Sequence, residues 1–336
     1  MIRVLMTGGG APGAPGILKC LKQNQELNIT VADANPDAVG RFLHNDFTQI
    51  PFASHPDFIP EVLELCRKKN IRVIMPLVTR ELFPLSENKE LFLKNNVKVL
   101  VSDFNYLSIA NNKSKLYGFL AEQGIEVPAF RVAKTVEEFE EAVHALGYPG
   151  SEVCFKPSVS NGSRGFRIIS DKVDERDLLF NQKPNSLYIR LTAIVNILSS
   201  GTFPELLVSE VLPGEEYSVD CLANKGNTLL AVPRLRKKMT GGISVEGEFV
   251  NEKGIINYSG EIIKALHLHG NIGIQVKRSV RNSFMLLEIN PRVQFPTNPI
   301  RVRRFDLRYR QSFAACDKTP ASAASLLPVS TIDCGN

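Results

Sequence analysis

The chain has 336 residues, of which 43% are hydrophobic, and a formal net charge of +5. This length suits about two domains of the usual size of about 100–200 residues, and the composition is that of an ordinary globular protein. Five arginines between Arg301 and Arg310 carry most of the charge, so the basic balance is local and argues against a nucleic-acid-binding protein.

The cysteines show neither a Cys-x-x-Cys pair nor the spacing of a disulfide framework or zinc site. They are Cys20, Cys66, Cys154, Cys221, Cys316 and Cys334. No apolar stretch approaches the length of about 20 residues that a transmembrane helix needs, and no export signal follows Met1. We therefore expect reduced thiols, a cytoplasmic location and no membrane span.

The first third alternates short apolar runs with amphipathic stretches. Strands are expected at Ile2–Met6, Asn28–Ala32, Ile71–Met75 and Val97–Val101. Between the second and third of these strands, Phe58, Val62 and Leu65 have the spacing of one helical face. Strands separated by helices predict a parallel sheet in a Rossmann-like α/β domain.

The second part, from about residue 111, has an α+β pattern. A helix is expected over Lys113–Gln123, because Gly124 supplies a C-terminal stop. Thr135 and Glu138 form a capping box ahead of another helix. Further strands are expected at Val153–Lys156, Phe166–Ile169, Leu206–Glu210, Glu216–Leu222, Gly273–Val276 and Ser283–Glu288.

A glycine-rich turn, Gly8–Gly13, follows the first expected strand, and Asp33 ends the second. This pattern satisfies the fingerprint of dinucleotide-binding proteins, in which glycine lets the backbone approach a pyrophosphate. Any tight strand-to-helix turn also favours glycine, and Pro12 and Pro15 prolong this one. The motif alone leaves open an NAD-dependent oxidoreductase, a turn facing another substrate, or a turn without a ligand.

Lys156 ends an expected strand and precedes a loop, Asn161–Gly165, that is rich in Ser, Asn and Gly. Such a loop lets backbone N–H groups approach phosphate oxygens, and a strand-anchored lysine supplies a fixed positive charge. A surface β-turn has the same composition. The broken strand Glu210–Glu216 is equally open to two interpretations, an edge that contacts a nucleotide or a bulge with solvated acids.

The most informative cluster lies on the last two expected strands. Gln275 is on one, and Glu288 and Asn290 end the next, followed by Arg292. Residues 288, 290 and 292 of one strand share a face. This arrangement predicts a site for Mg²⁺ or Mn²⁺ built from one carboxylate and two amide oxygens, with a guanidinium beside it for phosphate.

Taken in this order, the elements over roughly residues 1–294 resemble the ATP-grasp superfamily, and most closely carbamoyl-phosphate-synthase large-subunit-like proteins. The resemblance implies a Rossmann-like pre-ATP-grasp domain at residues 1–110, then an ATP-grasp domain of two α+β subdomains at 111–300 with a lid subdomain at roughly 125–205. Residues 301–336 are expected to form an atypical, disordered tail.

The resemblance also implies roles for single residues. It assigns ATP binding to Lys113, Lys156, Gly162, Ser163, Arg164, Gly165, Glu210, Val211, Leu212 and Glu216, metal binding to Gln275, Glu288 and Asn290, and stabilisation of the transferred phosphoryl group to Arg292. Arg234, Arg236 and Lys237 are expected to follow a strand. There Arg234 would hold a substrate carboxylate or an acyl phosphate; a solvated basic strand end is the competing interpretation.

The sequence departs from the family after Gln294, where the usual small residues and closing helix are missing. We therefore expect part of the core beside Ile289 and Val293 to lie uncovered. The predicted function is that of an ADP-forming ligase that joins a small-molecule carboxylate to an amine or thiol through an acyl phosphate. An inactive ATP-binding module and an NAD-dependent oxidoreductase are the alternatives, and the identity of both substrates and a homo-oligomeric state stay open.

Overall fold

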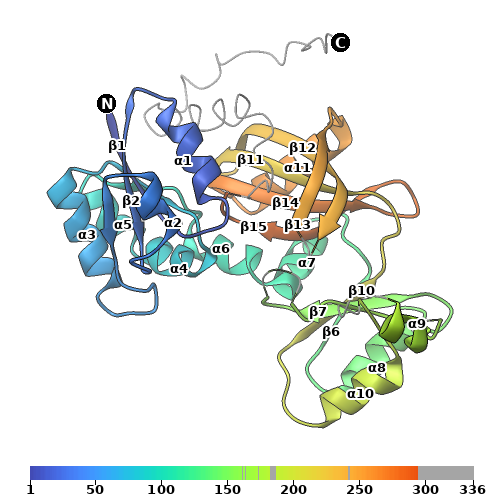
Figure 1. Ribbon diagram of the computed structural model, residues 1–336. Helices are drawn as coiled ribbons and strands as arrows, with labels where there is room; N and C mark the ends of the chain where they lie inside the picture. The colour runs from blue at the N-terminus through green and yellow to red at the C-terminus, as the bar shows by residue number, and fades with distance from the viewer. Residues whose placement is uncertain (161, 163, 173, 182–186, 241–242, 294–336) are drawn as a thin grey trace.

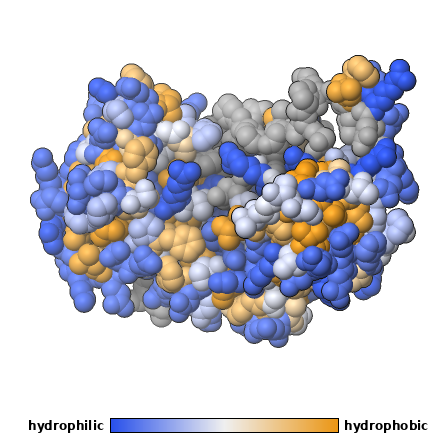
Figure 2. All heavy atoms as spheres, turned by 90° about the horizontal axis from the view of Figure 1, so that it is seen from below, coloured by the Kyte–Doolittle hydropathy of each residue, from blue (hydrophilic) through white to orange (hydrophobic). Residues whose placement is uncertain are grey.

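The computed structural model describes residues 1–160, 162, 164–172, 174–181, 187–240 and 243–293 (Figure 1). Within these ranges the chain forms three five-stranded sheets. The predicted tail, 301–336, lies outside them. Over the described residues, no helix combines the length and the apolar character needed to cross a bilayer. The face drawn in Figure 2 is mostly hydrophilic and is interrupted by separate apolar patches.

The first sheet is parallel and has helices on both faces. Its strands, in the spatial order β3-β2-β1-β4-β5, are β1 (Ile2–Thr7), β2 (Leu27–Asp33), β3 (Phe47–Gln49), β4 (Val73–Pro76) and β5 (Lys98–Val99). Its helices are α1 (Ala14–Lys22), α2 (Val39–Leu43), α3 (Phe58–Lys69), α4 (Thr79–Glu87), α5 (Lys89–Lys94) and α6 (Phe104–Ala110). In β1, Val4 and Met6 pack with α1, whereas Leu5 packs with α3 on the other face. This double burial explains the continuous apolar run and confirms the predicted α/β domain.

The second sheet follows α7 (Lys113–Glu122) and appears in green at the lower right of Figure 1. Its strands, in the order β6-β10-β7-β8-β9, are β6 (Phe130–Ala133), β7 (Val153–Pro157), β8 (Arg167–Ile169), β9 (Tyr188–Ile189) and β10 (Leu206–Glu210). Its helices are α8 (Val136–Ala145), α9 (Glu175–Phe180) and α10 (Leu191–Ser199). The predicted capping box is confirmed, since the Glu138 N–H donates to Thr135 Oγ1 at 3.2 Å and the Thr135 N–H donates to Glu138 Oε2 at 3.3 Å.

The third sheet is antiparallel, in the order β13-β12-β11-β14-β15. Its elements are β11 (Glu216–Asn224), β12 (Asn227–Thr240), β13 (Ile243–Phe249), α11 (Lys253–Ala265), β14 (Gly270–Arg278) and β15 (Phe284–Asn290). One face packs against α7 and α11 in a core that includes Val219, Ile274 and Ile289. Arg234 and Arg236 lie inside the long strand β12, so the expectation that they follow a strand is wrong.

The third sheet is joined to the first domain by direct contacts. The His269 N–H donates to Ser102 Oγ at 3.0 Å, and a Cβ on Gly270, whose φ is +90°, would lie 3.0 Å from the Leu100 carbonyl oxygen. Val293, just past β15, belongs to the core cluster of the first domain. Ile289 and Val293 themselves are buried, at 5% and 6% exposure, and the segment that would replace the closing helix lies outside the described residues.

Candidate functional site

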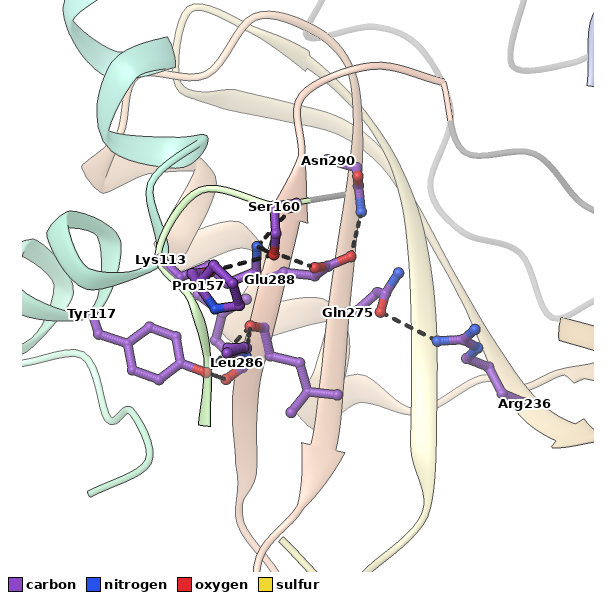
Figure 3. Close-up of polar contacts among 11 residues, drawn as sticks. Lys113, Tyr117, Pro157, Ser160, Arg236, Gln275, Leu286, Glu288 and Asn290 are labelled. Carbon is purple, nitrogen blue, oxygen red and sulfur yellow. Dashed lines mark hydrogen bonds and ion pairs between the residues drawn. The ribbon is translucent and has the colours of Figure 1, made fainter. Parts of the chain in front are cut away.

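The face of the third sheet opposite α11 carries a row of polar residues across four strands. Arg234 on β12 lies opposite Ser218 on β11, Ser218 lies opposite Gln275 on β14, and Gln275 lies opposite Glu288 on β15. Directly opposed residues project from the same face of a sheet, as do residues two apart in one strand, which adds Asn290. The structure therefore places the three predicted metal ligands, which Figure 3 shows, on the same face of the sheet as Arg234.

Glu288 is the only carboxylate among these predicted metal ligands, and its two oxygens have different partners. Asn290 Nδ2 donates to Glu288 Oε1 at 3.0 Å, and Lys113 Nζ lies 3.8 Å from Glu288 Oε2. The Lys113 side chain is 7% exposed, and its Nζ also donates to the Ser160 carbonyl at 2.9 Å. Burial lowers the pKa of Lys113, and the Glu288 carboxylate opposes that change. Figure 3 shows these groups meeting at the side of Glu288.

Helix α7 begins at Lys113 because Asn112 caps it. The Asn112 side-chain oxygen accepts a hydrogen bond from the Lys115 N–H at 3.0 Å. The first turn thus combines a lysine with the positive end of the helix dipole, and both favour an anion there. One turn later, Tyr117 donates its hydroxyl hydrogen to the Leu286 carbonyl at 2.6 Å. This bond ties α7 to β15, the strand that holds Glu288.

Lys156, near the end of β7, reaches the same strand from the second sheet. Its Nζ donates to the Leu287 carbonyl at 2.9 Å and lies 5.6 Å from the centre of the Tyr117 ring. The dense surroundings desolvate the ammonium group and lower the pKa of Lys156, although Glu288 opposes this. Lys113 and Lys156 are therefore two cations that face the predicted metal site from different elements.

The loop after β7 needs glycine at both ends. Gly162 and Gly165 have φ values of +65° and +77°, which side chains rarely adopt. A Cβ on Gly165 would also lie 2.6 Å from Pro157 Cδ. Arg164 is exposed, and the predicted contact Ser163 lies outside the described residues. The glycines thus fold the loop back over the end of β7.

The predicted adenine and ribose contacts lie at the junction of β10 and β11. The Glu210 carboxylate accepts a hydrogen bond from the Ala129 N–H at 2.8 Å, so this side chain already holds the segment before β6. Leu212 is 4% exposed, and Val211 is half-buried beside it. Glu216 begins β11, and its carboxylate accepts from the Arg236 guanidinium. These residues lie along the connection from β10 of the second sheet to β11 of the third.

Arg292 lies beyond the end of β15 rather than within it. The expectation that residues 288, 290 and 292 share one strand face is therefore wrong for Arg292. Its Nε donates to Thr79 Oγ1 at 3.0 Å, at the first residue of α4. Burial lowers the pKa of Arg292, and the Glu288 carboxylate counteracts this. The guanidinium thus stands between the predicted metal site and the first domain.

The glycine turn of the first domain has a packing role. Asp33 accepts hydrogen bonds from the Gly10 N–H at 2.7 Å and from the Asn35 N–H at 2.8 Å, one on each carboxylate oxygen. A Cβ on Gly9 would lie 2.6 Å from Val31 Cγ1. The acid that would bind a ribose in a dinucleotide site is therefore engaged with the turn itself, which does not favour the NAD interpretation.

The donor set fits a hard cation at Glu288 and Asn290. Among the residues that the structure describes, no three His, Cys, Asp or Glu side chains gather at a potential metal site. A magnesium ion commonly takes only one or two carboxylates and completes its shell with phosphates and water. Gln275 fits less well, because its Oε1 accepts a hydrogen bond from Arg236 Nη1 at 3.2 Å.

Three residues at the site were not predicted from the sequence. Tyr117 lies four residues after Lys113, so helical spacing could have placed both on one face. Ser160 belongs to the loop after β7, which could have drawn attention to it. Thr79 carries no local signal, because its partner Arg292 is 213 positions away.

Comparison with known proteins relates two parts of the chain to described families. The family model described as ATP-grasp in the biosynthetic pathway with Ter operon matches residues 202–295, and the PylC-like, N-terminal domain model matches residues 4–100. The carbamoyl phosphate synthase large chain of Clostridium acetobutylicum is 26% identical over 210 residues, which cover 59% of this chain and 18% of that protein. The chain thus corresponds to about a fifth of the length of this relative.

Two solved structures share the fold. The N5-carboxyaminoimidazole synthetase from Staphylococcus aureus complexed with ADP has a TM-score of 0.63 at 14% identity, over 87% of this chain and 71% of that one. The biotin carboxylase domain of the Hydrogenobacter thermophilus 2-oxoglutarate carboxylase, in complex with MgADP, ADP and bicarbonate, has a TM-score of 0.63 at 15% identity, over 92% and 69%. The chain is an ATP-grasp superfamily protein with a PylC-like N-terminal domain and distant similarity to the carbamoyl phosphate synthase large chain.

Proposed function

We propose that the protein is an ADP-forming ligase that activates a carboxylate as an acyl phosphate and transfers the acyl group to an amine or a thiol. The observation that carries the proposal is the convergence of Lys113, Lys156, Glu288 and Asn290 from α7, β7 and β15. Two cations and one carboxylate at a helix N-terminus suit the phosphates of ATP with a divalent cation.

The binding of ATP replaces the partners that Lys113 and Lys156 have in the free protein. Lys113 Nζ faces Glu288, and Lys156 Nζ is bonded to the Leu287 carbonyl. The ATP phosphates become the partners of both ammonium groups, which frees Glu288 from Lys113 so that it can hold the cation together with Asn290. The bound cation neutralises charge on the phosphates during transfer. Gly162, Arg164 and Gly165 lie in the loop that covers the phosphates.

In the first step, a carboxylate oxygen of the substrate forms a bond to the γ-phosphorus, and the bond from that phosphorus to the β-phosphate oxygen breaks to release ADP. Arg292, whose charge interacts with that of Glu288, neutralises the negative charge of the transferred group, and Arg234, three strands away on the same face of the sheet, holds the substrate carboxylate. In the second step, the amine or thiol bonds to the acyl carbon, phosphate leaves, and the nucleophile loses its proton to solvent. No side-chain nucleophile of the protein is needed.

The test is hydroxylamine trapping. With ATP, Mg²⁺, hydroxylamine and a panel of carboxylates, we expect a hydroxamate and ADP in equal amounts for the true substrate, because hydroxylamine attacks an acyl phosphate. The Glu288→Gln variant should remain folded and lose nearly all turnover, whereas Glu90→Gln, at an exposed position of α5, should not. AMP and pyrophosphate as the only nucleotide products would refute the mechanism.

Nucleotide titration separates the remaining possibilities. We expect binding of Mg²⁺-ATP and not of NAD, because Asp33 is engaged by Gly10 and Asn35. ATP binding without turnover for any carboxylate would instead support an inactive ATP-binding module.

A further inference from the structure

The guanidinium of Arg236 lies next to the predicted metal ligands. Arg236 is on β12, and its side chain is 5% exposed. Its Nη1 donates to the Glu216 carboxylate and, at 3.2 Å, to Gln275 Oε1. Figure 3 shows Gln275 between Arg236 on one side and Glu288 with Asn290 on the other. One fixed positive charge therefore adjoins this end of the site.

The Gln275 end of the row carries no negative charge of its own, whereas Glu288 is a carboxylate. Gln275 is a neutral amide, and its oxygen already accepts a hydrogen bond from a cation. A divalent cation coordinated by that oxygen would lie close to the guanidinium, in buried surroundings where water screens repulsion poorly. A carboxylate at position 275 would offset this repulsion, and an amide does not. At the other end of this row, Glu288 supplies a carboxylate, whereas the Glu216 carboxylate is paired with Arg236.

We propose that the site holds one divalent cation, at Glu288 and Asn290, and that Arg236 supplies the positive charge that a second cation would bring in a two-metal phosphoryl-transfer site. This inference rests on the proposed ATP-binding function. Arginine suits the task because it keeps its charge at every physiological pH and its planar group holds two acceptors at once. The bond to Glu216 fixes the guanidinium, so it needs no reorganisation when the nucleotide binds.

The experiment counts metal ions directly. The full-length protein is saturated with the β,γ-methylene analogue of ATP and titrated with Mn²⁺, and bound Mn²⁺ is measured by electron paramagnetic resonance. We expect one Mn²⁺ per bound nucleotide. The double variant Arg236→Met, Gln275→Glu replaces the cation by a neutral side chain and the amide by a carboxylate, and should bind two. Lys237→Met is the matched control, because Lys237 is exposed and paired with Glu248, and it should keep the count at one.

Two Mn²⁺ per nucleotide in the unaltered protein would overturn the inference, and so would a count of one in a folded double variant. If the double variant does not fold, as judged by circular dichroism, the count in the unaltered protein decides alone. Nucleotide affinity is measured separately. Two metals with tight nucleotide binding would overturn the one-metal inference and leave the proposed function standing, whereas no nucleotide binding would overturn both.

Discussion

Lys156 combines a positive charge with surroundings that disfavour it. Burial lowers the pKa of its ammonium group, which donates a hydrogen bond to the Leu287 carbonyl. A phosphate is a stronger partner than a carbonyl, because a charge-assisted hydrogen bond is worth about twice a neutral one. In the free protein the Lys156 ammonium group is therefore incompletely stabilised, and the binding of ATP stabilises it.

We expect Lys156→Met to weaken ATP binding roughly tenfold to a hundredfold, the equivalent of one charged hydrogen bond. In the unaltered protein, ATP affinity should fall as the pH rises, and should do so below the ordinary lysine pKa of 10.5, because burial lowers the pKa of Lys156 and the neutral amine no longer attracts phosphate. Calorimetric titrations between pH 7 and 10 measure both effects. Lys134→Met, on an exposed side chain of the second sheet, serves as control.

Glu81 is a buried acid outside the site. It accepts a hydrogen bond from Thr7 Oγ1 at 2.5 Å, and burial, with a contribution from Asp33, raises its pKa from 4.5 to about 8. Between these pH values the folded protein keeps the proton and the unfolded chain releases it. Stability therefore falls as the pH rises through this window.

The Glu81→Gln variant is neutral in both states, so it should lose this dependence and gain stability relative to the unaltered protein towards pH 8. At about 1.4 kcal/mol per pKa unit, the gain amounts to several kcal/mol. Urea unfolding at a series of pH values from 5 to 8 measures it. If the free energy of unfolding changed with pH in parallel for the two proteins, Glu81 would be ionised in the folded protein.

At the scale of elements, a hydrogen bond joins α4 to the segment just after β15, which is distant in the sequence. Thr79 begins α4, and its hydroxyl accepts from Arg292 Nε. This bond fixes the Nε edge of the guanidinium, while Nη1 donates to the Val293 carbonyl at 3.1 Å, so we regard Thr79 as a positioning residue for Arg292. We expect Thr79→Val to lower kcat about tenfold while KM for ATP stays within about twofold, the effect of one lost hydrogen bond to a charged group.

Thr79→Ser keeps the hydroxyl and should restore kcat, which a purely structural effect of the valine side chain would not explain. An unchanged kcat in Thr79→Val would show that Arg292 is positioned without α4. Steady-state kinetics with the carboxylate found by hydroxylamine trapping provides both constants.

Sequence patterns located the buried strands well and the polar ones poorly. Continuous apolar runs marked β1, β2 and β7, and polar residues at the ends of such runs marked Lys156 and Glu288. The strand expected before Arg234 ends too early, because Pro233 and the basic residues after it are typical of strand ends, whereas β12 continues to Thr240. Helix α4 was not predicted, because it contains Pro84 and proline is unusual inside a helix.

The contacts between elements could not be predicted at all. The bonds from Lys156 to Leu287 and from Arg292 to Thr79 join residues 131 and 213 positions apart. No local pattern encodes such a pair, since its geometry depends on how two separate cores pack. The resemblance to a family supplied the residue types of the site, and the structure supplied their partners.

At the scale of the whole molecule, Val293 anchors the end of the third sheet in the core of the first domain. We expect Val293→Ala to lower the free energy of unfolding by roughly 1–3 kcal/mol, the cost of a cavity in a packed core. It should also lower kcat, because Arg292 is the preceding residue. Val280→Ala removes the same atoms from a side chain that is 78% exposed and should change neither. Chemical denaturation and kinetics test the pair.

The close approach of Gly270 to Leu100 sets a limit on how this protein can be recombined with others. A Cβ at position 270 would press on the backbone of the segment after β5, and Ser102 is bonded to the neighbouring His269. The border between the first domain and the rest is therefore a fitted surface rather than a linker. A chimaera whose first domain comes from a relative must keep a matching residue at position 102 and the same backbone path at Leu100. Otherwise the first domain and the third sheet will not form their native contacts.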